Sequence, residues 1–303
     1  MGKKNTPRKN KKSKTGWLWP LAITVFLMIT LVAAGYIIFL GPGSLPPSGN
    51  PPEKAPLTSS SKNKKRLHIK KIKPGNNKKE VDHQPEGRLA IIIDDMGEQH
   101  KIGHALLDLD LPLSFSFLPF ASHTRDLLQS ARQKKRDILL HLPMEPENPK
   151  RDPGKGALYT TMSPTRIKMT IAADLTGVPG AIGVNNHMGS RFTADRKAMI
   201  PCLTFIDRKG LFFIDSLTSN ASVAPALARS SGFKIAKRDI FLDNRKDVEA
   251  IKANILSLVK IARQYGQSIG IGHPYQETLE ALRQSQDILQ RKVKMVAVHQ
   301  LVE

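Results

Sequence analysis

The stretch LAIIIDDMGEQ, residues 89–99, is the segment on which the interpretation of this chain depends. Its first five residues are apolar, and they are followed directly by two adjacent carboxylates, Asp94 and Asp95. A continuous apolar run of this length is typical of a strand that is buried on both faces of a parallel sheet. Two like charges repel each other at the tip of such a strand, so the rest of the sequence has to supply their partners.

Short apolar runs of the same kind recur after residue 89, and each is followed by a helix-like pattern. This alternation predicts a parallel sheet with helical connections. Seven or eight such runs fit an α/β fold that closes, or nearly closes, into a β/α barrel. The alternative is an open doubly wound sheet, which calls for a glycine-rich phosphate loop after the first strand. IIIDDMGEQH is not such a loop, so dinucleotide binding is not expected.

Polar side chains of catalytic type follow most of the predicted strands. The carboxyl ends of the strands of a β/α barrel open on one face, where enzymes of this fold place their active sites. We therefore expect residues that are far apart in the sequence to converge on Asp94 and Asp95. These residues are His141, Glu145, Asn185, Asn186, His187, Arg191, Asp215, Ser216 and His273.

Three histidines at strand ends, facing an acid pair, favour a metal site over histidines that are packed in a core. Carboxylate and imidazole together are a common ligand set for zinc and other divalent first-row metals. A bound cation also offsets the repulsion between the two acids, so one can bind the ion while the other stays free as a base. The remaining histidines are expected to be structural or solvent-exposed, and these are His68, His83, His100, His104, His123 and His299.

The overall charge of the 303 residues is +21, but it is unevenly distributed. Residues 1–88 hold 18 Lys/Arg and 4 Asp/Glu, whereas residues 89–303 hold 29 Lys/Arg and 22 Asp/Glu. Most of the basic charge therefore belongs to an N-terminal segment and not to a folded surface. The single cysteine, Cys202, excludes an intrachain disulfide, and its apolar neighbours predict a small core residue.

An uncharged apolar segment, Trp17–Leu40, follows a basic start. About 20 apolar residues span a bilayer as a helix. Seven Lys/Arg precede the segment, whereas Lys54 alone lies in the twenty residues after it. The positive-inside rule then places residues 1–16 in the cytoplasm and the remainder outside it. We expect a single-pass signal anchor in the inner membrane with a periplasmic domain; a signal peptide cleaved after VAA, residues 32–34, is the alternative.

Residues 41–88 are rich in Pro, Gly, Ser, Asn and Lys and show no apolar period. This composition predicts a disordered linker. The linker lacks aromatic residues that would stack on bases, and it is expected outside the cytoplasm, so nucleic-acid binding is not expected. Residues 89–303 remain, and they are numerous enough for one large domain with its own core.

Five motifs occur in order along this domain: IIIDDMG, LLHLPMEP, GVNNHMGSRFTAD, FFIDSLTS and GIGHPYQETLEAL. Together they resemble the divergent polysaccharide deacetylase family, a branch of the NodB-like carbohydrate esterases with a distorted (β/α)7 barrel. The resemblance covers essentially residues 89–303 and does not include the anchor or the linker.

The resemblance implies distinct roles for the acid pair, with Asp94 as the general base and Asp95 as a metal ligand. In the wider group, a second motif carries two metal-binding histidines four residues apart. Here that spacing gives His141 and Glu145, so the second histidine is absent. Either Glu145 binds the metal instead or His187 does, and we favour His187 because of the asparagines before it and the Gly-Ser after it.

The same resemblance assigns His273 as the general acid, while Asp215 would orient that acid or another site residue. Asn186, Arg191 and Tyr275 are expected to bind substrate. Tyr159 and Phe192 are further candidates for stacking on sugar rings, although core packing is an equal alternative for Phe192.

The implied function is a metal-dependent hydrolase, with zinc as the expected ion, that removes N-acetyl groups from an envelope polysaccharide of the peptidoglycan type. The alternative is a non-catalytic module that keeps the barrel and binds a glycan or a cell-wall partner. The missing second histidine favours the binding module, and the retained acid pair favours the enzyme.

Overall fold

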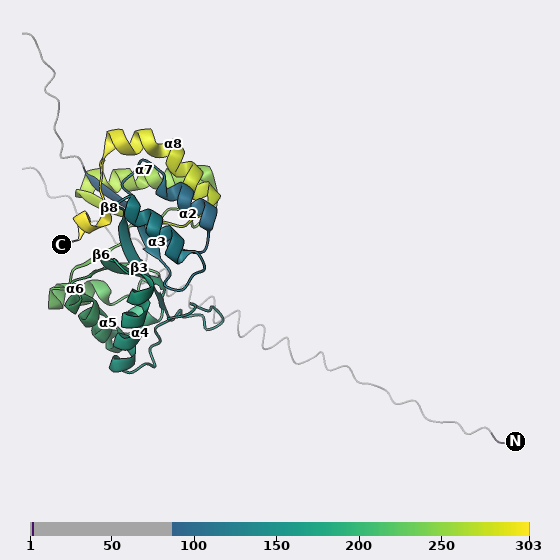
Figure 1. Ribbon diagram of the computed structural model, residues 1–303, viewed down its shortest axis with the longest axis vertical. Coiled ribbons are helices and arrows are strands. Elements are labelled where there is room, and N and C mark those ends of the chain that lie inside the picture. Colours follow the sequence, from purple (N-terminus) through teal and green to yellow (C-terminus); the bar gives the residue numbers. More distant parts are fainter. Residues whose placement is uncertain (1, 3–86, 303) are drawn as a thin grey trace, which may run out of the picture. The chain divides into compact units, whose positions relative to one another are not determined.

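The computed structural model describes residue 2 and residues 87–302, in which helices surround a curled sheet (Figure 1). The predicted cytoplasmic tail and membrane anchor and nearly all of the predicted linker lie outside the described residues. Within residues 87–302, no helix combines the length and the apolar character that a membrane crossing requires.

Strands and helices alternate along the described chain, as the apolar runs predict. The strands are β1 (Arg88–Met96), β2 (Ser114–Phe117), β3 (Asp137–Met144), β4 (Gly183–Met188), β5 (Phe212–Asp215), β6 (Ile235–Lys237), β7 (Ile240–Phe241), β8 (Gln267–Gly272) and β9 (Lys294–Met295). The helices are α2 (His100–Leu107), α3 (Thr124–Gln133), α4 (Pro164–Gly177), α5 (Arg196–Arg208), α6 (Ala224–Ser231), α7 (Val248–Tyr265) and α8 (Gln276–Lys292), with the 3-10 turns η1 (Phe192–Ala194) and η2 (Val298–Leu301).

All pairings between these strands are parallel, in the order β6-β5-β4-β3-β2-β1-β8-β7, with β9 also paired to β1. Only Arg238 and Asp239 separate the two edge strands, β6 and β7, in the sequence. The backbone N–H of Arg238 donates to Asp215 at the tip of β5 (3.0 Å), and that of Asp239 donates to Ile269 in β8 (2.8 Å). The sheet therefore curls until its edges come close together, which fits the predicted distorted barrel.

Alternation along β1 divides its side chains between two hydrophobic clusters. Leu89 and Ile91 belong to the larger cluster, which includes the apolar faces of the helices. Ala90 and Ile92 belong to the smaller cluster, which fills the interior of the curled sheet. Because successive side chains of a strand point to opposite faces, Asp94 lies on the interior face with Ala90 and Ile92.

The interior changes from apolar to polar along the strands. Apolar side chains fill the amino ends, among them Ala90, Leu139, Phe212, Ile269, Val298 and Leu301. The turn η2 closes this end, where the N–H of Val298 donates to Ser114 Oγ (2.9 Å). At the carboxyl ends, the interior side chains are Asp94, Ser116, His141 and Asn185, none more than 2% exposed. The fold thus buries polar groups at one end of the barrel.

The helices pack in neighbouring pairs outside the sheet, with α7 against α8 and α4 against α5 (Figure 1). Their ends follow sequence signals. The Ser163 side chain accepts from the N–H of Arg166 (3.2 Å), and Pro164 occupies the first helical position of α4. Cys202 on α5 is fully buried, as predicted for a core residue, and burial raises the pKa of its thiol to about 12.

Candidate active site

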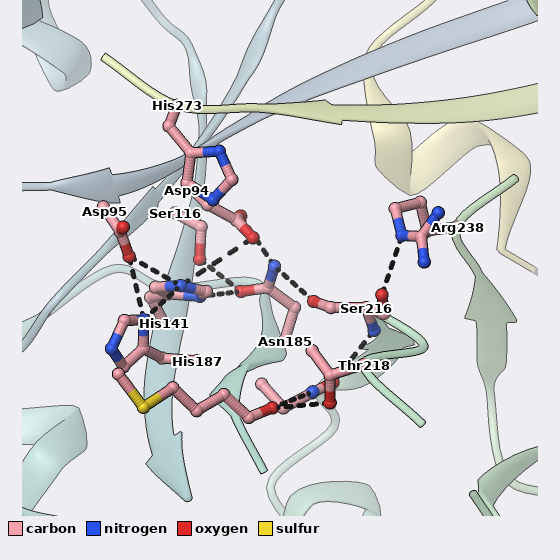
Figure 2. A network of polar contacts seen from close by, with 12 residues as sticks. Asp94, Asp95, Ser116, His141, Asn185, His187, Ser216, Thr218, Arg238 and His273 are labelled. Carbon is pink, nitrogen blue, oxygen red and sulfur yellow. Dashed lines mark hydrogen bonds and ion pairs between the residues drawn. The ribbon is translucent and has the colours of Figure 1, made fainter. Parts of the chain in front are cut away.

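The tip of β1 directs its two carboxylates into one cluster. Side chains of neighbouring residues in a regular strand point to opposite faces. Asp95 leaves that regularity because its φ is +52°, in the left-handed region. This conformation is uncommon for residues other than glycine, although aspartate adopts it more readily than most. Figure 2 shows Asp94 and Asp95 on the same side of the polar network.

Asp95, His141 and His187 form what we call the inner cluster (Figure 2). Oδ1 of Asp95 lies 3.1 Å from Nε2 of His141 and 2.9 Å from Nδ1 of His187. The two imidazole nitrogens lie 3.2 Å apart. Oδ1 is buried and has no hydrogen-bond partner among the described residues. A carboxylate oxygen and two ring nitrogens that face one point, in a buried place, are a donor set that fits a divalent cation.

Asn185 on β4 links the acid pair to the histidines. Its Nδ2 donates to Oδ1 of Asp94 (2.7 Å), and its Oδ1 lies 2.8 Å from Nδ1 of His141. Ser116 Oγ also donates to the Oδ1 of Asn185. Because an amide oxygen only accepts, Nδ1 of His141 carries a proton, and Nε2 is the ring nitrogen that faces the inner cluster.

Burial and charge act differently on the two carboxylates. Burial raises the pKa of Asp94 above its ordinary value, although the charges of His141 and His273 and the Asn185 hydrogen bond oppose it. Burial would also raise the pKa of Asp95, but His141 and His187 outweigh it and hold that pKa well below its ordinary value. Asp95 therefore stays ionised, while Asp94 is the more basic of the two.

His273 follows β8 and is held by Asp243, which follows β7. Nδ1 of His273 lies 2.8 Å from Oδ1 of Asp243, whose Oδ2 accepts from the backbone N–H of His273 (2.6 Å) and from Thr278 Oγ1 (2.8 Å). Burial lowers the pKa of His273, but the hydrogen bond and charge of Asp243 outweigh it and raise the pKa to about 9. His273 is therefore protonated at neutral pH.

Aromatic rings accompany His273. Its ring stacks with those of Phe241 and Tyr275, at centroid distances of 5.9 and 5.6 Å. The guanidinium of Arg238 lies 3.8 Å above the Phe241 ring, and the Lys246 ammonium lies 3.6 Å from the Tyr275 centroid. These contacts fix the His273 ring in position beside Asp94.

A cleft of about 470 Å³ opens over these groups. The inner cluster, Asp94, His273 and Tyr275 line it, together with the cations Arg151 and Lys246. This volume lies within the range of about 300–1,000 Å³ that is usual for small-molecule sites. The cleft therefore combines a cation site, a buried carboxyl with a raised pKa and a protonated imidazole.

Comparisons with known proteins agree with this arrangement. A family model described as "Divergent polysaccharide deacetylase" matches residues 91–302. The chain belongs to this family. The match spans the acid pair, the inner cluster and His273, so all of these groups lie within the family domain.

Two curated relatives are similar in sequence. The uncharacterized protein YibQ of Escherichia coli (strain K12) is 34% identical over 198 residues, which cover 65% of this chain and 62% of that protein. An uncharacterized protein of Haemophilus influenzae is 33% identical over 216 residues, covering 71% of this chain and 77% of that one. The match thus covers less than two thirds of YibQ.

Solved structures share the fold. The uncharacterized protein ATU2773 of Agrobacterium tumefaciens C58 superimposes with a TM-score of 0.69 at 26% identity, over 72% of this chain and 89% of that chain. EF3048 of Enterococcus faecalis V583 superimposes with a TM-score of 0.51 at 15% identity, over 72% of this chain and all of that one. The second likeness concerns the fold alone.

Two residues are candidates for the position of the second histidine, Glu145 and His187. The structure brings His187, and not Glu145, to the inner cluster. Glu145 instead accepts from the N–H and Oγ1 of Thr160 (2.7 and 2.8 Å). Nε of Arg191 lies 3.5 Å from the other carboxylate oxygen of Glu145, and the Arg191 side chain is 57% exposed. Glu145 therefore stabilises a loop. Arg191 is not among the residues that line the cleft, and its role in substrate binding stays a prediction.

Asp215 makes no hydrogen bond to His273, and its alternative role, in orienting another site residue, stays a prediction. Its carboxylate accepts from the N–H of Leu217 (2.9 Å) and from Ser222 Oγ (2.7 Å) in the turn after β5. Asp243 occupies the orienting position because the curl of the sheet places β7, and not β5, next to β8.

Other predicted substrate residues have mixed surroundings. Asn186 lines the cleft, but its amide accepts from the N–H of Ser216 (2.9 Å) and donates to Met188 (2.8 Å). Phe192 is fully buried in the core, which leaves it unable to stack on a sugar. Tyr159 is 37% exposed and lies outside the cleft lining, whereas Tyr275 lines it.

Asp243 is not among the site residues predicted from the sequence, and Asn185 is predicted to lie in the site but is given no role. Asp243 directly follows the strand-like run RDIFL, so the rule that identified the other strand-end residues also identifies this one. Asn185 was placed at a strand end without a role. Its role follows from the alternation of side chains along a strand. Val184 faces the helices, so the next residue, Asn185, faces the interior of the sheet.

Proposed function

We propose that this member of the divergent polysaccharide deacetylase family is a metal-dependent hydrolase that removes N-acetyl groups from an envelope glycan. The observation that carries the proposal is the different environment of the two adjacent acids. Asp95 faces two imidazoles, whereas Asp94 is buried with a raised pKa and feels the charge of His273. A cation site next to a basic carboxylate and a protonated imidazole is suited to amide hydrolysis.

Asp95, His141 and His187 would hold the metal ion, and zinc suits two imidazoles with one carboxylate. The fit rests on the buried oxygen of Asp95, which lacks a hydrogen-bond partner among the described residues and faces one ring nitrogen each of His141 and His187. When bound, such an ion polarises the amide carbonyl and lowers the pKa of a water molecule.

Proton transfer is the task of the chain's own side chains. Asp94 takes a proton from the attacking water, and its raised pKa makes it a stronger base for this step. Asn185 holds Oδ1 of Asp94 through a 2.7 Å hydrogen bond and so fixes the direction of the carboxylate. The water oxygen bonds to the carbonyl carbon as the C–N bond breaks.

His273 donates a proton to the nitrogen that leaves as an amine. Asp243 keeps the imidazole protonated, since the pKa of His273 is raised to about 9. The products are acetate and a free amino sugar. Asp243 also orients the ring through Nδ1, which leaves Nε2 as the atom that delivers the proton.

The substrate is proposed to be an N-acetylated polysaccharide of the peptidoglycan type, with Tyr275 at the edge of the sugar site. Its ring lines the cleft next to His273. The segment Trp17–Leu40 would anchor the chain in the inner membrane and place the domain on the periplasmic side, where such a glycan is accessible. A reporter fused to the C-terminus should then be active outside the cytoplasm, and activity in the cytoplasm alone would refute this topology.

The test of the activity is acetate release from chitooligosaccharides and from peptidoglycan fragments. The full chain is stripped of metal, assayed, and assayed again after one ion per chain has been restored. Activity should appear only with the ion, and wild type and the remote variant His299→Ala should behave alike. A metal-loaded protein that binds glycan but releases no acetate from any of these substrates would instead identify a binding module.

A further inference from the structure

A second group of histidines and a carboxylate converges on the outside of the barrel. His100 and His104 lie one turn apart on α2, and Asp126 lies in the first turn of α3. Oδ2 of Asp126 is 2.9 Å from Nε2 of His100 and 2.7 Å from Nε2 of His104. We call these three residues the outer cluster. The sequence prediction that both histidines are merely structural or solvent-exposed leaves this convergence unexplained.

The geometry of the outer cluster resembles a chelate more than a chance surface contact. Side chains four residues apart on a helix lie on one face, which is the spacing by which paired histidines bind zinc. Both rings direct the same nitrogen, Nε2, at the same oxygen of Asp126. The exposed surface offers each imidazole water as a partner, so hydrogen bonding alone gives no reason for two rings to share one oxygen.

Two neighbours complete the surroundings of the cluster. The His123 ring lies 4.9 Å from that of His100, centroid to centroid, so a third imidazole is within reach. Ser130 Oγ lies 3.4 Å from Nδ1 of His104. A partner at Nδ1 keeps Nε2 directed at a bound ion, as the outer partners of metal-binding histidines commonly do.

We propose that His100, His104 and Asp126 form a second divalent metal site, for zinc or a similar first-row ion, with His123 as a fourth ligand on ring rotation. Two Nε2 atoms and a carboxylate oxygen supply three ligands of the tetrahedral arrangement that zinc adopts in proteins. The ion replaces the protons that the imidazoles now share with Asp126, so its binding releases protons and weakens at acidic pH.

The position of the outer cluster gives the ion a structural task. α2 follows the tip of β1, which carries the acid pair, and α3 follows β2. The N–H of His123 donates to the carbonyl of Gly97, between β1 and α2 (2.9 Å). An ion held by both helices would therefore clip together the loop after β1 and the loop after β2. It takes no part in hydrolysis.

Metal counting tests this site directly. The full chain, purified in detergent without a polyhistidine tag, is loaded with zinc, dialysed and analysed for metal. The double variant His100→Ala/His104→Ala should bind about one ion fewer per chain than wild type. This difference isolates the outer site whether or not the inner cluster binds an ion, so it does not depend on the proposed hydrolase activity.

Three controls make the result decisive. Asp126→Asn keeps the shape of the side chain but removes a ligand. It should lower the zinc affinity of the outer cluster by at least roughly 10–100-fold, which is the cost of losing a hydrogen-bond partner of a metal ligand. His299→Ala removes an imidazole that contacts a carboxylate elsewhere and should leave the count unchanged. His187→Ala should keep the outer ion.

Thermal unfolding in the presence of a chelator shows whether each variant folds. Zinc should raise the midpoint temperature of unfolding less for the double variant than for wild type.

Equal zinc counts for wild type and the folded double variant would overturn the proposal. An equal loss of zinc in His299→Ala and in the double variant would also overturn it. Zinc binding would then depend on how many histidines the chain has and not on the outer cluster. If the double variant fails to fold, Asp126→Asn alone decides, and unchanged affinity in that variant refutes the site.

Discussion

The two histidine–aspartate clusters of this domain have the same composition but are built in different ways. The inner cluster takes its residues from three strands that are far apart in the sequence. His141 is buried and hydrogen-bonded to the buried Asn185, whereas Asp95 and His187 are half-buried. The outer cluster takes its residues from two consecutive helices and lies in solvent, with one neighbour at 3.4 Å from His104. Residue type alone therefore does not separate the two sites, whereas burial and the neighbouring hydrogen bonds do.

This difference has a consequence for affinity and for chemistry. Buried hydrogen bonds fix the His141 ring before an ion arrives, so the inner cluster loses little conformational freedom on binding. Exposed side chains of the outer cluster keep more rotamer freedom, and water competes at each ligand. Only the inner cluster adjoins a carboxyl with a raised pKa, Asp94. We therefore expect chemistry at the inner cluster and a structural effect at the outer one.

The largest expected effect is on the rate of hydrolysis in Asp94→Asn. This change keeps the size of the side chain but removes the base, so acetate release should fall roughly 10²–10⁴-fold. The zinc content of both clusters should remain, because neither cluster includes Asp94. Asp95→Asn should lose activity and the inner ion together. An Asp94→Asn variant that keeps full activity would show that another group accepts the proton.

The next largest effect is on zinc affinity, and it tests the hydrogen bonds that hold the histidines of each cluster. Asn185→Leu removes the partner of His141 Nδ1 and should lower the zinc affinity of the inner cluster by about 10–100-fold. The matched variant Ser130→Ala removes the longer, exposed contact of His104 and should weaken the outer cluster less. Zinc titrations in the presence of a competing chelator measure both. Equal losses in the two variants would contradict the view that burial preorganises the inner cluster alone.

A pH effect should distinguish the buried His273–Asp243 pair from the exposed imidazoles. Because the pKa of His273 is raised to about 9, folding favours its protonated form. The pair therefore stabilises the domain fully below about pH 6.5, the ordinary pKa of histidine, and this stabilisation is lost as the pH rises through about 9. Asp243→Asn should be less stable than wild type at pH 6, by on the order of 1–3 kcal/mol.

Urea unfolding of the metal-free protein measures this difference at several pH values. The gap in the free energy of unfolding between wild type and Asp243→Asn should narrow between pH 6 and pH 9.5. A gap that stays constant over this range would mean that Asp243 acts on folding by its hydrogen bonds to the backbone and to Thr278, and not by the charge of His273.

Much of this arrangement follows from strand patterns, and the remainder depends on how the sheet curls. The apolar runs and the polar residues after them predict parallel strands and bring His141, His187 and His273 to one end. No local pattern shows that β7 pairs with β8, so the sequence offers Asp215 as a candidate to orient His273 and gives no role to Asp243. The outer cluster was missed for a similar reason, since Asp126 belongs to another helix than His100 and His104.

The smallest expected effect concerns the histidine at the opposite end of the barrel. Nδ1 of His299 lies 2.7 and 2.9 Å from the two carboxylate oxygens of Asp137, as close as the imidazoles of either cluster lie to theirs. One imidazole does not form a chelate, however, and the His299 side chain is 47% exposed. His299→Ala should therefore lower the free energy of unfolding by about 0–1 kcal/mol and leave the zinc content unchanged. Chemical unfolding with parallel metal analysis measures both quantities. A loss of several kcal/mol in the free energy of unfolding would show that one exposed imidazole–carboxylate contact is strongly stabilising. A loss of one zinc ion would show that one imidazole beside a carboxylate is enough to bind zinc, without burial or a second imidazole.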